Sequence, residues 1–154
     1  MSTRQKVWMM VLVLLTFSSL AEAGRLGIGL NYPGLNLRYG SEKSALEVKI
    51  QFGEDSKIYG LRGYKISKDS KDSNFTPYLG IEMDLVSSDF LKGGLGIGSF
   101  VGIEKFLSKS KNLAINFDAG IYYLSLDSSL GGIKDVGLVL NSGINWYFGG
   151  GEKK

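Results

Sequence analysis

The sequence contains no cysteine and no histidine among its 154 residues, and it has only two prolines. The lack of cysteine excludes a disulfide framework and thiolate metal sites, and it argues against lipid attachment to the chain. The lack of histidine excludes hydrolysis by a Ser–His pair. The net charge is only +3 and its signs are mixed along the chain. Nucleic-acid binding would require a concentrated basic face, which the sequence does not contain.

A helical periodicity is also lacking. After Gly24 no segment places apolar residues at the i, i+3, i+4, i+7 spacing of an amphipathic helix. Glycine, in contrast, is abundant at 22 residues, and aromatic side chains make up 12% of the chain. Much glycine and many aromatic residues with little proline favour β-structure, and the length suits one domain.

Residues 1–23 have the order of a secretory signal peptide. Arg4 and Lys6 precede an apolar run over residues 7–15, and small residues follow it. This run is shorter than the about 20 apolar residues that a membrane-spanning helix needs, so cleavage is favoured over an uncleaved anchor. We therefore expect export from the cytoplasm. The expected cleavage site is formed by Ala21, Ala23 and Gly24.

The rest of the chain, residues 24–148, alternates apolar and polar side chains with period two, which predicts β-strands. The clearest case is residues 46–52, where four apolar side chains interleave with Glu47, Lys49 and Gln51. The expected strands lie at about 26–32, 35–39, 46–52, 57–66, 78–85, 92–106, 113–123 and 136–148. Because eight is an even number, both termini of the chain are expected on the same side of the sheet. The connections expected on the opposite side are 32–34, 53–56, 86–91 and 124–134.

The two faces of these strands differ in composition. Alternation alone does not distinguish a lipid-facing sheet from a water-facing one. Here one face is apolar and almost free of charge, whereas the other combines charged residues with glycine, which suits the crowded interior of a narrow barrel. The sequence therefore predicts an all-β protein, an eight-stranded antiparallel up-and-down transmembrane barrel, followed by a polar tail at 149–154.

Aromatic residues gather near the ends of the expected strands, as in the girdles of membrane barrels. Ordinary strand preference for aromatic residues is the alternative explanation. The residues assigned to the girdles are Tyr32, Tyr39, Phe52, Tyr59, Phe106, Tyr123, Trp146 and Phe148.

Charged residues on the opposite face are expected to fill the barrel interior as a paired network, because buried charges persist only with partners. The members are Arg38, Glu47, Lys49, Arg62, Glu82, Asp84, Glu104 and Asp118. A path for protons or cations is the functional alternative. Glu82 and Asp84 face the same way and could suggest acid–base catalysis, but no motif or cleft accompanies them. We predict no enzyme activity, no cofactor and no metal site.

The C-terminal strand resembles the terminal β-signal of outer-membrane barrels, in which a polar residue precedes a glycine and two hydrophobic residues. The residues that match are Asn141, Gly143, Trp146 and Phe148. The resemblance implies recognition by the barrel-assembly machinery. The tail at 149–154 departs from the pattern, since family members commonly end at the aromatic residue.

By strand count, length and end motif, the mature chain resembles the small OmpA/OmpX-type barrels. The segments 76–80 and 102–106 also resemble strands of porin-like barrel proteins of unassigned role. The resemblance implies a monomer in the outer membrane of a Gram-negative envelope, with lipid and lipopolysaccharide as its surroundings. We expect a structural or surface-interaction role: envelope integrity, adhesion or lipopolysaccharide contact. The alternatives are a secreted or periplasmic soluble barrel that binds a small apolar ligand and, less favoured, a narrow ion pore.

Overall fold

The computed structural model describes residues 24–41, 43–67, 75–88, 93–107, 112–127 and 132–148. The expected signal peptide with Ala21 and Ala23, the tail 149–154 and residues 68–74, between the fourth and fifth expected strands, lie outside the described residues. Within the described ranges, no helix is long and apolar enough to cross a membrane.

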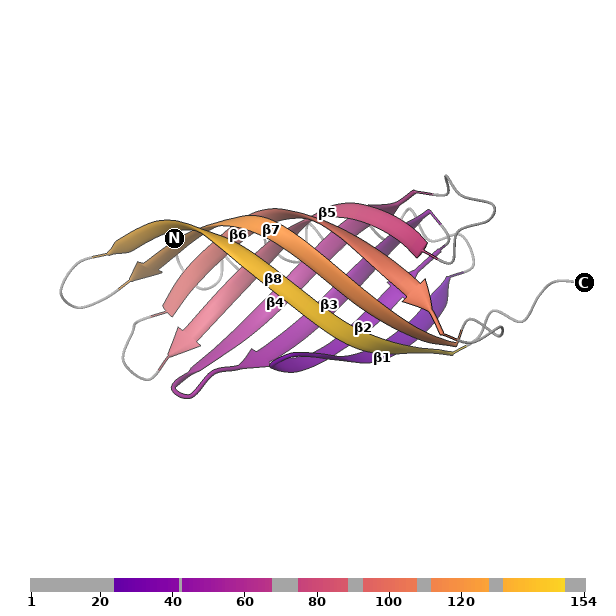
Figure 1. Cartoon of the computed structure of the whole chain (residues 1–154). Coiled ribbons are helices and arrows are strands. Elements are labelled where there is room, and N and C mark those ends of the chain that lie inside the picture. The colour runs from indigo at the N-terminus through magenta and orange to yellow at the C-terminus, as the bar shows by residue number, and fades with distance from the viewer. Residues whose placement is uncertain are drawn as a thin grey trace, which may run out of the picture.

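The described residues form eight strands, whose arrangement Figure 1 shows. They are β1 (Arg25–Asn31), β2 (Gly34–Gly40), β3 (Ser44–Phe52), β4 (Ser56–Ile66), β5 (Phe75–Ser88), β6 (Gly93–Phe106), β7 (Leu113–Asp127) and β8 (Ile133–Phe148). Each strand pairs antiparallel with the next along the chain, as short connections favour.

The sheet closes into a barrel because β1 also pairs with β8. This seam runs from Leu26 opposite Phe148 to Asn31 opposite Gly143. Closure gives the backbone groups along the seam hydrogen-bond partners, which an open sheet edge would lack. The expected all-β class, the number of strands and the antiparallel closed barrel are confirmed.

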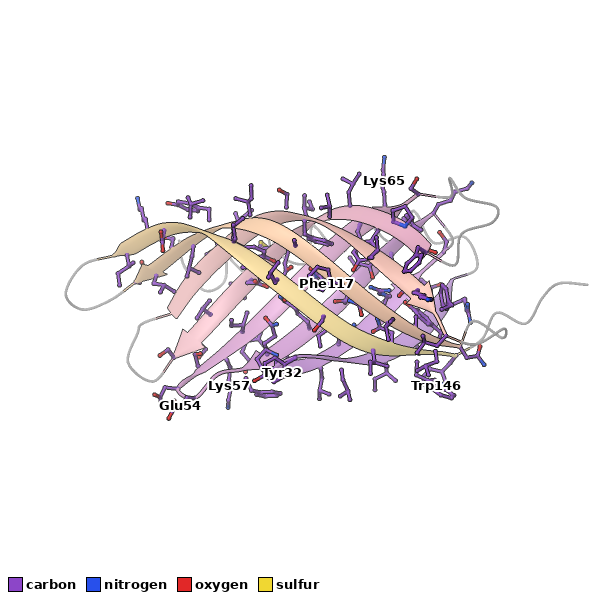
Figure 2. All side chains as sticks on the ribbon, viewed as in Figure 1. Tyr32, Glu54, Lys57, Lys65, Phe117 and Trp146 are labelled. Atoms are coloured by element: carbon purple, nitrogen blue, oxygen red, sulfur yellow. The ribbon has the colours of Figure 1, made fainter. Side chains whose placement is uncertain are left out.

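The polarity of the two faces of the wall is opposite to that of a soluble barrel, in which the apolar face lies inside and the charged face meets water. Apolar side chains such as Leu79 and Leu140 point outward and are 62% and 68% exposed. Glu47 and Arg62 point inward and are 0% and 1% exposed. Side chains line the outer face along the whole barrel (Figure 2). Leu61 is an exception. Its pairing with Val48 and Met83 places it on the outward face, yet it is only 3% exposed.

The wall of the barrel is low on one side and high on the other. β1 and β2 have 7 residues each, whereas β5 to β8 have 14 to 16. Among the described residues, the first part of β8, from Ile133 to Asn141, therefore pairs with β7 alone. The high side stands out at the end of the barrel where β7 turns into β8 (Figure 1).

Two of the expected connections are wrong in extent. Residues 86–88 belong to β5, and much of 124–134 belongs to β7 and β8. Backbone pairing continues there through Leu124 opposite Asp135 and Leu126 opposite Ile133. The side chains in these parts of β7 and β8 do not alternate cleanly between apolar and polar. The main-chain hydrogen bonds that pair the strands do not depend on such alternation.

One girdle assignment is also wrong. Phe106 has the inward parity of Glu104, two residues before it, and its ring contacts Tyr147 with centroids 5.7 Å apart. The other seven aromatic residues assigned to the girdles are exposed on the outer face. Tyr32 and Trp146 illustrate this at opposite ends of the low wall (Figure 2).

Candidate functional site

The barrel interior is occupied by a network of charged side chains that begins with a cross-strand row. Arg38, Glu47, Arg62 and Glu82 stand directly opposite one another on β2, β3, β4 and β5. Opposite charges therefore alternate across four adjacent strands, an arrangement that stabilises a sheet. Period-two alternation places each of these residues inside, and the register brings them into one line.

Arg62 is the centre of this network. Its Nη1 lies 3.3 Å from Glu47 Oε1 and its Nε lies 3.0 Å from Glu82 Oε2. Its Nη2 lies 2.8 Å from Asp118 Oδ1, which comes from β7 across the lumen. The guanidinium carbon also lies 3.9 Å from the centre of the Phe100 ring. One buried cation thus joins three strands around the barrel axis.

Arg38 makes a second bridge across the lumen. Its Nε lies 3.1 Å from Glu47 Oε2, and its Nη1 lies 2.5 Å from Glu104 Oε1 on β6. Nη1 also contacts the Tyr147 hydroxyl, and the guanidinium carbon lies 4.8 Å from the Tyr64 ring centre. Planar guanidinium groups can pair with carboxylates and stack on rings at the same time, which suits this position.

Lys49 pairs with two carboxylates of β5, namely Glu82, which Arg62 also contacts, and Asp84. Its Nζ contacts Glu82 and lies 3.9 Å from Asp84 Oδ1. Gly60 stands between Lys49 and Asp84 in the register. A Cβ at Gly60 would lie 2.5 Å from Lys49 Cε, so the glycine leaves the space through which the lysine reaches across β4.

All eight charged residues assigned to the lumen are thus buried and brought together by the structure. The group contains five carboxylates and three cations. Neutral hydrogen-bond donors supply part of the difference. The Tyr78 hydroxyl donates to Asp118 Oδ2 at 3.0 Å, and the Tyr147 hydroxyl donates to Glu104 Oε1 at 2.7 Å.

Amide side chains complete this supply of donors. Asn141 Nδ2 donates to Asp118 Oδ1 at 2.9 Å, and Asn31 Nδ2 donates to Glu47 Oε1 at 3.2 Å. Tyr78, Tyr147 and Asn141 have the inward parity of their strands, but the predicted network did not include them. Their inward parity next to charged residues is the pattern that could have identified them.

The arrangement favours pairing over catalysis. Glu82, the first member of the possible acid–base pair, is engaged by both Lys49 and Arg62. Among the described residues, no three potential ligands gather in a way that would hold a metal ion. What the network can do chemically is neutralise buried charge and fill the lumen of an eight-stranded barrel.

Comparison with known proteins agrees with the architecture. The structure is similar to that of Neisserial surface protein A, with a TM-score of 0.54 and 17% sequence identity. The match covers 81% of this chain and 93% of that protein. The likeness is one of fold. It confirms the resemblance to small eight-stranded barrels of the outer membrane at the level of architecture. No family model and no curated protein sequence matches the chain.

The residues of the assembly-signal motif divide between the two faces of β8. Trp146 and Phe148 point outward and are half-exposed, and Phe148 pairs with Leu26 at the seam. Asn141 and Gly143 point inward, where a Cβ at Gly143 would lie 2.9 Å from Asn116 Oδ1. The motif thus spans the part of β8 that closes the barrel, and its role in assembly stays a prediction.

Proposed function

We propose that the protein is a non-catalytic integral barrel of the bacterial outer membrane, exported as a precursor, whose role is structural or surface-interactive. The observation that carries this proposal is the polarity of the wall. Side chains such as Leu37 and Val101, 50% and 65% exposed, face outward while the charges are enclosed. A lipid environment stabilises this arrangement, and water would not.

The unequal height of the wall supports a surface role. The high side, formed by β5 to β8, extends beyond the turn between β1 and β2. If the low side spans the membrane, the outer part of the high side stands clear of it and meets molecules outside the cell. Envelope integrity, adhesion and lipopolysaccharide contact are the roles compatible with such a wall.

The two alternative functions fit the interior less well. A carrier of a small apolar ligand needs an apolar cavity inside, whereas this interior contains Arg62, Glu82 and the other members of the charge network. An ion pore needs an open path, whereas the network bridges the lumen from β2 to β6 through Arg38 and Glu104.

The test is an arginine placed on the outward face. Leu37 is the middle residue of β2 and pairs with Ile28, the middle residue of β1. In a bilayer we expect Leu37→Arg to lower the free energy of unfolding by about 2–4 kcal/mol, the cost of arginine near the midplane. Urea titration of the refolded protein in lipid vesicles, with heat-modifiable migration in detergent gels as the folding assay, measures it.

The matched control is Ser87→Arg, which places the same side chain outward and exposed near the outer end of β5. We expect a change of about 0–1 kcal/mol there. A mature protein that is monomeric in buffer without detergent, and that tolerates Leu37→Arg unchanged, would overturn the proposal.

A further inference from the structure

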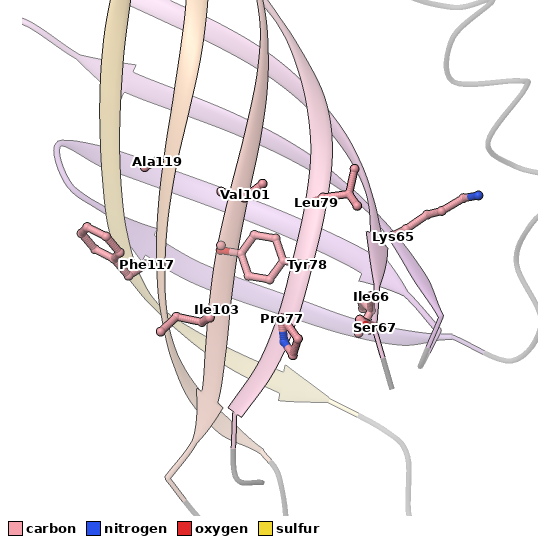
Figure 3. A pocket seen from close by; sticks show the side chains of 11 residues that line it. Lys65, Ile66, Ser67, Pro77, Tyr78, Leu79, Val101, Ile103, Phe117 and Ala119 are labelled. Carbon is pink, nitrogen blue, oxygen red and sulfur yellow. The ribbon is translucent and has the colours of Figure 1, made fainter. Parts of the chain in front are cut away.

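A groove crosses the outer face of the barrel between two rows of outward side chains. The first row contains Leu79, Val101 and Ala119, which stand opposite one another on β5, β6 and β7. The second row contains Pro77, Ile103 and Phe117 on the same strands. The space between them, here called the lateral groove, has a volume of about 740 Å³ (Figure 3).

The lateral groove is shaped by small residues and by the direction of the rows. The side chain of Ala119 is short, so the first row is low at its β7 end. Gly102 lies at the bottom of the lateral groove. The rows run perpendicular to the strands, and strands of membrane barrels tilt by about 35–45°. The lateral groove therefore runs obliquely to the membrane plane and not parallel to it. An acyl chain, which extends along the membrane normal, can follow such a groove.

Lys65 stands at one end of the lateral groove, next to Leu79 in the first row (Figure 3). It is exposed and points outward from β4. It makes no ion pair with any carboxylate in the described part of the chain. A lysine beside a lipid-facing groove is stabilised when its ammonium reaches the headgroup level and meets a negative charge.

Among the described residues, the charge at this end of the barrel is of one sign. Apart from the eight members of the lumen network, the described charged residues at the end where β4 and β6 finish are Arg25, Lys43, Lys65 and Lys105. The described charged residues at the opposite end are Glu54, Asp55, Lys57, Asp127, Lys134 and Asp135. The basic end complements phosphate groups, and the mainly acidic end does not.

We propose that the lateral groove holds an acyl chain of an anionic phospholipid whose phosphate lies against Lys65. The inference rests on the membrane location proposed above. The apolar rows would bury the chain, and the basic end of the barrel would select the headgroup. The site belongs to the leaflet on the side of the strand termini, where β1 begins and β8 ends.

The test uses the mature protein reconstituted in bilayers of equal parts phosphatidylglycerol and phosphatidylcholine. The protein is extracted in a mild detergent, and the lipids that stay bound to it are identified by native mass spectrometry. We expect wild type to retain phosphatidylglycerol in preference to phosphatidylcholine. Lys65→Gln should lower that retention about fivefold, the effect of one basic residue near a membrane surface. Ala119→Trp, which fills the groove, should lower the retention of both lipids.

Two matched controls keep the test specific. Lys134→Gln removes a lysine from the opposite end, and Ile121→Trp adds a tryptophan to the outward face of β7 beyond the groove. Both should retain lipid as wild type does. Lys65→Arg should retain it as well, which separates the loss of charge from a folding defect. Heat-modifiable migration of every variant verifies that the barrel is folded.

Three results would overturn the inference. They are equal retention of the two lipids by wild type, unchanged retention by Lys65→Gln or Ala119→Trp, and displacement of the lipid by millimolar inorganic phosphate, which would indicate a simple anion site. Any of these in a folded, heat-modifiable barrel leaves the proposed membrane function intact. Loss of the folded barrel from membranes would instead contradict the proposed function itself.

Discussion

Arg62 occupies a place where one guanidinium is enclosed by three carboxylates and a phenylalanine ring. It is 1% exposed, and its partners come from β3, β5 and β7. Removing one partner from a buried ion pair leaves charges without compensation in a medium that solvates them poorly. At this position Asp118 would lose its only cationic partner among the described residues, whereas Glu47 and Glu82 would keep only Arg38 and Lys49, respectively.

We therefore expect Arg62→Ala to lower the free energy of unfolding by about 3–5 kcal/mol. Arg62→Lys should lower it less, because a single ammonium keeps the charge but cannot reach all three carboxylates at once. Urea titration of the refolded barrel in lipid measures both values. Lys57→Ala, at an exposed position of the outer end, serves as control and should change stability by less than about 0.5 kcal/mol. A loss below 1 kcal/mol for Arg62→Ala would contradict the role assigned to this residue.

β8 has two parts with different surroundings. Its second part, from Gly143 to Phe148, lies between β1 and β7 and closes the barrel. Its first part pairs only with β7 among the described residues and carries Leu138, which is 83% exposed. A strand edge without partners is tolerated where water or another molecule can satisfy its backbone groups. This supports an outer position for the first part.

The closing part of β8 contains three of the four residues that resemble an assembly signal, namely Gly143, Trp146 and Phe148. We expect Phe148→Ser to lower the yield of heat-modifiable barrel in the outer membrane several-fold, because the resemblance implies that the assembly machinery recognises this aromatic residue. In the folded barrel Phe148 is half-exposed, so refolding of the purified variant in detergent should remain close to wild type. Quantitative immunoblots of membrane fractions measure the yield.

The control for this prediction is Ile133→Ser at the other end of the same strand, also half-exposed. Its membrane yield should match wild type. Equal yields of Phe148→Ser and wild type would remove the assembly role from this motif, and poor refolding of Phe148→Ser in detergent would assign its effect to stability.

The whole molecule is a filled cylinder whose charged interior is tied together across the lumen. Bridges run from Arg38 on β2 to Glu104 on β6 and from Arg62 on β4 to Asp118 on β7. Aromatic rings add a further layer, in which Tyr64 and Tyr78 lie 5.1 Å apart between ring centroids. An eight-stranded barrel has only enough interior for such side chains, so no continuous water column is expected.

We expect planar bilayers containing the purified mature barrel to show no conductance steps at voltages where a general porin, the positive control, gives clear steps. The physical reason is that an ion would have to break bonds between buried charges to pass. Reproducible unit steps that scale with the amount of folded barrel would restore the ion-pore alternative.

Periodicity and composition were sufficient to assign the class of fold and the inward or outward direction of most side chains in the expected strands. A β-strand has a period of two residues, so one charged residue such as Glu47 or Asp118 assigns a face to the whole strand around it. The eight interior charges were found in this way, and so was the outward position of Leu79 and Val101. Phe106 was misplaced because its aromatic character was given more weight than its parity relative to Glu104.

Which of these residues contact one another depends on the register and closure of the barrel. Period and composition carry no information about register, and the register between neighbouring strands sets Arg38, Glu47, Arg62 and Glu82 in one row. Closure then brings β7 across the lumen to Arg62. The low and high sides of the wall were also decided there, because main-chain hydrogen bonds extend strands through segments whose side chains show no alternation. Contacts between distant strands depend on the geometry of the closed barrel, which no local pattern contains.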